Sequence, residues 1–332
     1  MLRTLSRVLL TFLARTRLVP LPILMLAAGL LMGGLADLRA APPEAEPAPG
    51  PRSPFSYPAG RLLFSGERNG QWDLYQWVPE PGPHGTIVPL TRTPEPEGNP
   101  VWWPRHRLIL CSRRQPDGRW GLVALRLDGT TAWTLTDPLG NLGWPQPSPW
   151  DDRILAVRED PVTGFTQPGW CVFPDGGFQP IGGTEDPAGG QMAWIAPDEI
   201  LVTRVSPQGS DLCHRLLSTG EERPLVQGGR NWLPAAAPSG GPPFFFTRRV
   251  GQTGSIFSLR PRPDAPWDYD PCTLGRPYDW QPAVTPDREG LLFLSLRDGR
   301  FRVVWRRLDD GHEQEIPLTG FTGIYHPTWF VP

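Results

Sequence analysis

The chain has 332 residues and a hydrophobic content of 39%, which is enough for a packed core and excludes disorder throughout. Its 32 basic residues are balanced by 34 acidic ones, so the net charge of −2 gives no support for nucleic-acid binding through phosphate neutralisation. With 44 prolines, 37 glycines and 15 tryptophans, the composition favours many short strands joined by turns over long helices.

The first forty residues have the pattern of an export segment. Four arginines within the first seventeen residues precede an uncharged apolar run, Leu18–Ala36, and small residues follow around Ala40. About twenty apolar residues span a bilayer, so the run is either cleaved or retained as an anchor. We expect residues 1–40 to be a signal peptide or an N-terminal membrane anchor, and residues 41–57 to be a Pro/Ala-rich linker. The basic residues before the run then place the remainder outside the cytoplasm, in the periplasm or another extracytoplasmic location, where a retained run would anchor it to the inner membrane.

Beyond the linker, short segments that end on a proline recur along the chain. Successive final prolines are 45, 48, 41, 48 and 46 residues apart, at Pro104, Pro149, Pro197, Pro238, Pro286 and Pro332. Each unit continues with an apolar run, a Gly-bearing turn, an alternating segment and a last short run, which three units end in Leu-Thr. Alternation with period two between Gly and Asp turns is typical of hairpins, so each unit is predicted to contain four short strands.

Four antiparallel strands in about 46 residues have the size of one propeller blade. We therefore predict an all-β fold over residues 58–332, a six-bladed β-propeller of four-stranded antiparallel blades. Its first unit starts at Arg61 with what would be a second strand. The aromatic C-terminus, His326–Pro332, is expected to pair beside Arg61–Gly66 as the missing innermost strand and to close the ring.

The repeats also carry short motifs at equivalent places. Thr285-Pro286-Asp287 and Ala196-Pro197-Asp198 precede apolar strands, and the stretch from Ser112-Arg113 to Gly118 forms a turn. This pattern resembles the WD40-like, Pro-Asp type repeats of the TolB family over roughly Pro58 to Pro332. The resemblance implies an exported propeller. The chain departs from that family in having only a proline-rich linker, and no α/β domain, before its blades.

Four widely spaced cysteines, Cys111, Cys171, Cys213 and Cys272, form no C-x-x-C pair, so zinc and redox chemistry have no support. One or two disulfides remain open for an exported protein, and small buried side chains are the other interpretation. Paired acids at 151–152, 268/270 and 309–310 are interpreted as solvated turn residues, with calcium binding as the alternative. We expect no metal and no cofactor.

An arginine follows the second strand of every unit, at equivalent places near one rim of the predicted ring. These candidate binding residues are Arg68, Arg113, Arg158, Arg204, Arg248 and Arg297. Six guanidinium groups around an opening would attract an anionic partner, such as an acidic protein segment or a carboxylated glycan. The alternative interpretation is that each arginine bonds an acid or a carbonyl within its own turn.

No catalytic residue is assigned, because the chain has no G-x-S-x-G nucleophile motif and no hydrolase domain after its repeats. The sequence therefore predicts a monomeric, non-enzymatic scaffold in the cell envelope that binds an envelope protein or peptide. Contact with a membrane would occur only through the N-terminal segment. The alternative is a carbohydrate- or peptide-binding protein, or an enzyme, that uses the central channel. Acids and histidine converging on one mouth would favour the alternative, and an apolar or Arg-lined mouth would favour the scaffold.

Overall fold

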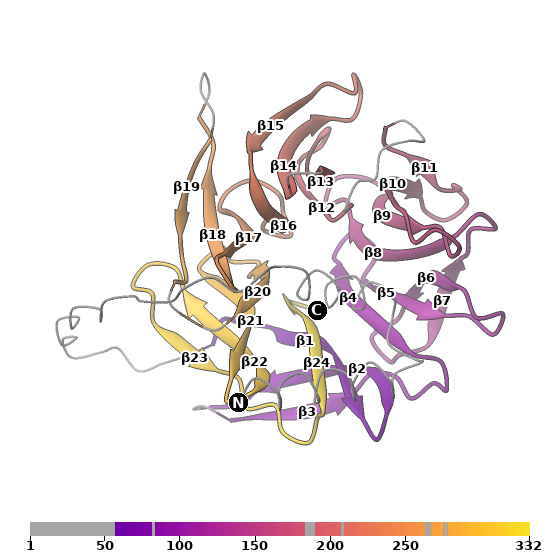
Figure 1. Ribbon diagram of the computed structural model, residues 1–332. Helices are drawn as coiled ribbons and strands as arrows, with labels where there is room; N and C mark the ends of the chain where they lie inside the picture. The colour runs from indigo at the N-terminus through magenta and orange to yellow at the C-terminus, as the bar shows by residue number, and fades with distance from the viewer. Residues whose placement is uncertain are drawn as a thin grey trace, which may run out of the picture. The chain divides into compact units, whose positions relative to one another are not determined.

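The computed structural model describes residues 57–81, 84–182, 190–206, 209–262, 267–274, 276 and 278–332. The predicted export segment and all of the linker except Tyr57 lie outside the described residues. Every regular element in the described part is a strand, and no helix found there is long and apolar enough to cross a membrane. Residues 57–332 belong to one compact unit (Figure 1).

Sixteen strands form four separate four-stranded antiparallel sheets. The first sheet has the order β24-β1-β2-β3, with β1 (Arg61–Arg68), β2 (Gln71–Pro79), β3 (Gly85–Pro89) and β24 (Gly323–Phe330). The second contains β4 (Glu97–Trp103), β5 (Leu108–Arg114), β6 (Trp120–Leu125) and β7 (Thr131–Leu135). The third contains β8 (Asn141–Pro147), β9 (Arg153–Glu159), β10 (Thr166–Val172) and β11 (Gln179–Pro180). The fourth contains β20 (Asp279–Val284), β21 (Gly290–Arg297), β22 (Arg300–Arg307) and β23 (Glu313–Glu315).

The other eight strands form one hydrogen-bonded sheet, which corrects the expectation of six separate blades. They are β12 (Met192–Ala196), β13 (Glu199–Ser206), β14 (Gly209–Leu216), β15 (Glu222–Val226), β16 (Gly229–Ala235), β17 (Phe244–Val250), β18 (Thr253–Arg260) and β19 (Asp268–Pro271). A short parallel contact joins β14 to β16, with Gly209 opposite Gly229 and Ser210 opposite Arg230. Gly209 has a φ of 141°, and a Cβ there would overlap the Gly229 carbonyl, so the absence of a side chain permits the merger.

The core lies between successive sheets, and β5 shows why its sequence is apolar without alternation. Ile109 and Cys111 pack with Leu63 and Leu74 of the first sheet. Leu110, which points to the opposite face, packs in a separate cluster with Ile154 of the third sheet. A strand buried on both faces needs an apolar residue at every position, which explains the uninterrupted apolar runs that follow each proline-terminated segment.

The first sheet takes its innermost strand from the C-terminus. β24 pairs antiparallel with β1, with Arg61 opposite Phe330, Leu62 opposite Trp329 and Leu63 opposite Thr328. The strand is Gly323–Phe330 and ends before Val331 and Pro332, which are exposed. The pairing segment therefore lies a few residues earlier than the predicted His326–Pro332, because Trp329 and Phe330 are the last side chains with an apolar space to fill.

All four cysteines are free thiols. Cys111, Cys171 and Cys213 are buried, and burial raises the pKa of the Cys171 and Cys213 thiols to about 12. Such thiols stay protonated and unreactive at neutral pH. The cysteines therefore act as small apolar side chains of the core.

Candidate functional site: the central cavity

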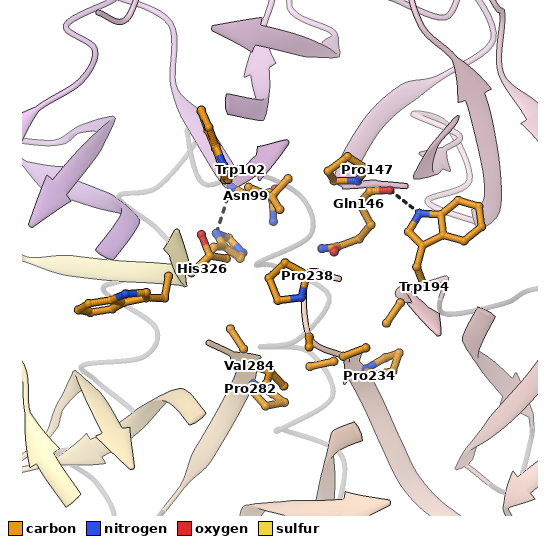
Figure 2. A pocket seen from close by; sticks show the side chains of 18 of the residues that line it. Asn99, Trp102, Gln146, Pro147, Trp194, Pro234, Pro238, Pro282, Val284 and His326 are labelled. Atoms are coloured by element: carbon orange, nitrogen blue, oxygen red, sulfur yellow. Dashed lines mark hydrogen bonds between the residues drawn. The ribbon is translucent and has the colours of Figure 1, made fainter. Parts of the chain in front are cut away.

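The inner strands of all the sheets meet at one cavity of about 350 Å³ (Figure 2). Its walls come from β4, β8, β12, β16, β20 and β24 and from a few residues directly before or after them. In Figure 1 these six strands surround the middle of the propeller, while the outer strands of each sheet lie farther out. The cavity is therefore the channel that the repeat architecture predicts.

A distorted X-Pro dipeptide shapes five of the six inner strands. The residue before the proline is left-handed, with φ between 53° and 57°, in Asn99, Trp144, Leu233, Gln281 and His326. At each of these places the strand pairing skips both the left-handed residue and its proline. Positive φ is rare for residues other than glycine, and a following proline restricts the residue further. Repeated backbone strain around one cavity is typical of a functional site.

The spacing of prolines in the sequence marks these dipeptides. In four units a second proline precedes the terminal proline by four residues, as in Pro100 and Pro104 or Pro282 and Pro286. The terminal prolines alone establish the repeat. The earlier proline of each pair marks the bulge that lines the channel.

The left-handed residues of three consecutive inner strands are linked by hydrogen bonds. Gln281 Oε1 accepts from the backbone N–H of His326 at 2.9 Å. Figure 2 shows the next bond, in which His326 Nδ1 accepts from the backbone N–H of Asn99 at 3.3 Å. Ser112 Oγ donates to Asn99 Oδ1 at 3.2 Å and continues the chain into β5. We call Gln281, His326 and Asn99 the polar belt, because their side chains join β20, β24 and β4 across sheet boundaries.

His326 is neutral in this arrangement. Because Nδ1 accepts a hydrogen bond, the proton of the neutral ring lies on Nε2. Desolvation by burial lowers the pKa of His326 to about 3. The ring also packs edge to face against Trp144, with ring centroids 4.9 Å apart. A histidine held in this way positions backbone and aromatic groups, and its low pKa makes it a poor general base at neutral pH.

The rest of the cavity wall is apolar or amide-bearing. The lining residues include nine prolines, four tryptophans and three glutamines, and none of them is Asp, Glu, Lys or Arg. The Gln146 side chain projects toward the middle of the cavity in Figure 2, and its amide has no hydrogen-bond partner among the described residues. Within the part of the chain that the structure describes, the channel wall is therefore uncharged at neutral pH.

The six arginines predicted from the repeat lie on the second strand of each four-strand unit, and none of them lines the cavity. Four are ion-paired within the protein. Their pairs are Arg113 with Glu97 at 2.5 Å, Arg158 with Asp137 at 3.3 Å, Arg204 with Glu222 at 2.5 Å, and Arg297 with Glu313 at 3.2 Å. Three of these acids lie on other strands of the arginine's own sheet, and Asp137 lies in the connection between β7 and β8.

The remaining two arginines also contact the protein. Arg68 donates to the Thr319 carbonyl at 3.3 Å and lies 4.0 Å from the centroid of the Phe321 ring. Arg248 donates to Asn231 Oδ1 at 2.8 Å. Every arginine of the set thus has an internal partner, and joint capture of an anionic partner by all six stays a prediction.

The acid pairs considered for calcium are bonded to arginines. Asp151 pairs with Arg153 at 2.6 Å, and Arg105 donates to Asp152 at 3.0 Å. Arg307 pairs with both members of the third acid pair, Asp309 and Asp310. The described residues contain no group of three or more His, Cys, Asp or Glu side chains that could hold a metal ion.

The chain matches no protein-family model and no curated protein sequence. Its fold is that of solved propellers. It aligns with TolB from Acinetobacter baumannii at a TM-score of 0.64 and 13% identity, covering 81% of this chain and 66% of that one. A TolB structure from Agrobacterium tumefaciens gives a TM-score of 0.60 and 16% identity over 78% of this chain and 89% of that one.

A puromycin-hydrolysing peptidase from Mycobacterium tuberculosis aligns at a TM-score of 0.55 and 16% identity, over 80% of this chain and 44% of that one. At such identities the likeness establishes the fold alone. The protein is thus a β-propeller whose fold is similar to that of TolB, as its repeats predict.

Proposed function

We propose that the protein is an exported, six-bladed TolB-like propeller that acts as a non-enzymatic interaction scaffold in the cell envelope. The merged sheet counts as two blades, β12 to β15 and β16 to β19, because only two residue pairs join them. β24 then completes the ring from the C-terminus by pairing with β1. The export segment predicted at residues 1–40 supports an extracytoplasmic location. If this segment is retained, it attaches the protein to the inner membrane.

The uncharged cavity is the observation that carries this proposal. Hydrolysis and most group transfers need a titratable acid or base at the reacting centre. Among the described lining residues the only such group is His326, whose pKa of about 3 leaves it unprotonated and poorly basic. The lining offers apolar contact and amide hydrogen bonds instead, which suit binding. The protein is expected to work as a monomer, without cofactor, on an envelope protein or peptide.

A catalytic use of the channel is the competing proposal, because the fold neighbours include the puromycin-hydrolysing peptidase. This chain spans 44% of that peptidase, so the shared part is the propeller.

The proposal is tested by photo-crosslinking in the cells that produce the protein. A photoreactive amino acid replaces Gln146 in the cavity or, as the control, Val88 on the outer strand β3, which is 41% exposed. A discrete protein adduct from position 146 that is absent from position 88 is expected. Adducts of equal yield from both positions, or turnover of a peptide or oligosaccharide by the purified protein that Gln146→Leu abolishes, would contradict a scaffold that binds through its channel.

A further inference from the structure

The composition of the cavity wall restricts what can enter it. The nine prolines and five alanines of the lining have no side-chain hydrogen-bonding groups and present carbon atoms to an occupant. A volume of about 350 Å³ lies at the lower end of the range of roughly 300–1,000 Å³ for ligand pockets. The cavity is therefore too small for a folded domain and suits a short segment of chain with a mainly apolar surface.

Three of the hydrogen-bonding side chains at the wall are glutamine amides. Gln146 and Gln191 come from β8 and from the residue just before β12, and neither amide has a partner among the described residues. Gln281 uses its Oε1 atom in the polar belt and keeps its NH₂ group. The Trp144 indole N–H also has no partner in the described part of the chain. These groups can donate to backbone carbonyls spaced along an extended peptide.

Electrostatics exclude a charged occupant. No lining residue carries a full charge, and burial keeps the His326 ring neutral. An ion entering this wall would lose its hydration without gaining a counter-charge, which is costly. A neutral sugar would also bind poorly, because its many hydroxyl groups need more acceptors than four side-chain amides and a few carbonyls provide.

We propose that the cavity binds an uncharged, proline-containing peptide segment in the extended polyproline II form. Its carbonyls accept hydrogen bonds from the Gln146, Gln191 and Trp144 donors, and its pyrrolidine rings pack on the proline- and alanine-rich wall. A polyproline II segment has no internal hydrogen bonds and little conformational entropy to lose, which suits a wall with few donors. This inference rests on the proposed function and gives its partner a chemical class.

The test uses the purified chain and capped tetrapeptides. Binding of acetyl-Pro-Ala-Pro-Pro-amide is followed by tryptophan fluorescence and by calorimetry. Peptides with Glu or Arg in place of Ala, and the neutral sugar maltotetraose, serve as comparisons. We expect the uncharged peptide to bind at least about tenfold more tightly than either charged peptide, since the loss of one hydrated charge corresponds to more than 1.4 kcal/mol.

Two variants locate the site. Gln146→Leu keeps the side-chain size and removes the amide, so it should weaken peptide binding about tenfold, whereas Gln252→Leu on the exposed turn before β18 should not. Ala283→Trp fills the cavity from β20 and should abolish binding while the far-ultraviolet spectrum stays that of the parent.

Equal binding of the charged peptides, binding of maltotetraose alone, or unchanged affinity in Gln146→Leu would overturn the inference. If the peptide fails to bind while position 146 still captures a partner in cells, the inference falls and the proposed scaffold function stands. If neither occurs, both fall.

Discussion

Two junctions between neighbouring sheets of this propeller are built in different ways. At the chain-end junction, β24 from the C-terminus lies between β20 and β4, and the polar belt joins the three strands through side chains. At the continuous junction, β14 and β16 belong to one stretch of chain and pair directly through backbone at Gly209 and Ser210. Only the second junction merges two sheets into one.

The two junctions differ in the groups that hold them. The continuous junction is held by backbone contact between β14 and β16, whereas the chain-end junction is held by the side chains of Gln281 and His326. Asn231 supports the continuous junction with three of its own groups. Its backbone N–H donates to Ser210 Oγ at 2.8 Å, its Nδ2 donates to the Ser210 carbonyl at 2.7 Å, and its own carbonyl accepts from Ser210 Oγ at 2.7 Å. Glycine serves both junctions, because a Cβ at Gly60 would overlap the Phe330 carbonyl just as one at Gly209 would overlap that of Gly229.

Removing the C-terminal strand should have the largest effect on the chain-end junction. Deletion of residues 323–332 exposes the edge of β1 and empties the space of Trp329 and Phe330, which are 2% and 0% exposed. We expect loss of cooperative folding, seen as the absence of a thermal transition by circular dichroism. Deletion of Val331 and Pro332 alone, beyond the strand, is the control and should leave the transition unchanged. A stable, cooperative 1–322 chain would mean that the ends do not form a structural junction.

Two equivalent arginines allow the junctions to be compared by single substitutions. Arg113 pairs with the buried carboxylate of Glu97 beside the chain-end junction, and Arg248 bonds the neutral Asn231 at the continuous one. Arg113→Gln leaves a buried charge without its counter-charge and should cost about 3–5 kcal/mol in the free energy of unfolding. Arg248→Gln leaves a neutral amide and should cost about 1 kcal/mol.

Denaturant titration measures the loss in free energy of unfolding for both variants. Repeating it at low pH shows whether the loss depends on the charge of Glu97. Burial raises the pKa of Glu97, so at low pH the carboxyl group is protonated and the cost of Arg113→Gln should shrink. Equal losses for the two variants, independent of pH, would show that these arginines do not differ in the way the structure indicates.

Asn231→Ala tests the continuous junction itself. The substitution removes the two Nδ2 hydrogen bonds, to Ser210 and Gly228, and leaves Arg248 without its acceptor, at a fully buried site. We expect a loss of about 3 kcal/mol in the free energy of unfolding, measured in urea. Ser239→Ala, at an exposed loop position, is the matched control. A loss below that of the control would mean that the backbone bridge alone holds β14 to β16.

The polar belt predicts a pH dependence of smaller size. The folded pKa of His326 is about 3 against an ordinary value of 6.5, so the unfolded chain binds a proton between these values and the folded chain does not. Stability is therefore complete above pH 6.5 and falls as the pH drops toward 3, by about 2 kcal/mol at pH 5.

His326→Gln replaces the ring with an amide that does not titrate. Its Oε1 atom can accept from the Asn99 N–H, as Gln281 Oε1 accepts from the N–H of residue 326. Its difference in stability from the parent should change by that amount between pH 7 and pH 5, as measured by thermal unfolding. A constant difference over this range would show that the ring is not buried in its neutral form.

The fold was largely predictable from the sequence. Runs such as Leu108–Cys111 are apolar at every position because both faces of β5 are buried, and turns of Gly and Asp mark where each strand ends. The pairing of the C-terminal segment with β1 could be predicted because the first repeat unit lacks an innermost strand and the last segment of the chain has one to spare. The merger of two blades did not, because it depends on two glycines, Gly209 and Gly229, whose φ values no repeat pattern indicates.

The site was less predictable. Equivalent positions of the arginines could be read from the repeat, but their partners could not, because Asp137 and Glu222 lie at different places in their units. The polar belt required the left-handed geometry of Gln281, His326 and Asn99 to be known. Nothing in the local sequence of His326 distinguishes a buried neutral ring from a solvated one.

Native-state hydrogen exchange tests the central claim, that the pairing of the two chain ends, β1 with β24, is as stable as strand pairing within the merged sheet. The amides of Leu62 and Trp329, in β1 and β24, are compared with those of Leu201 and Leu212 in the merged sheet. The structure predicts that both pairs exchange only through global unfolding, with the same free energy and the same denaturant dependence. Exchange of β24 through local opening at a free energy well below the global value would contradict it.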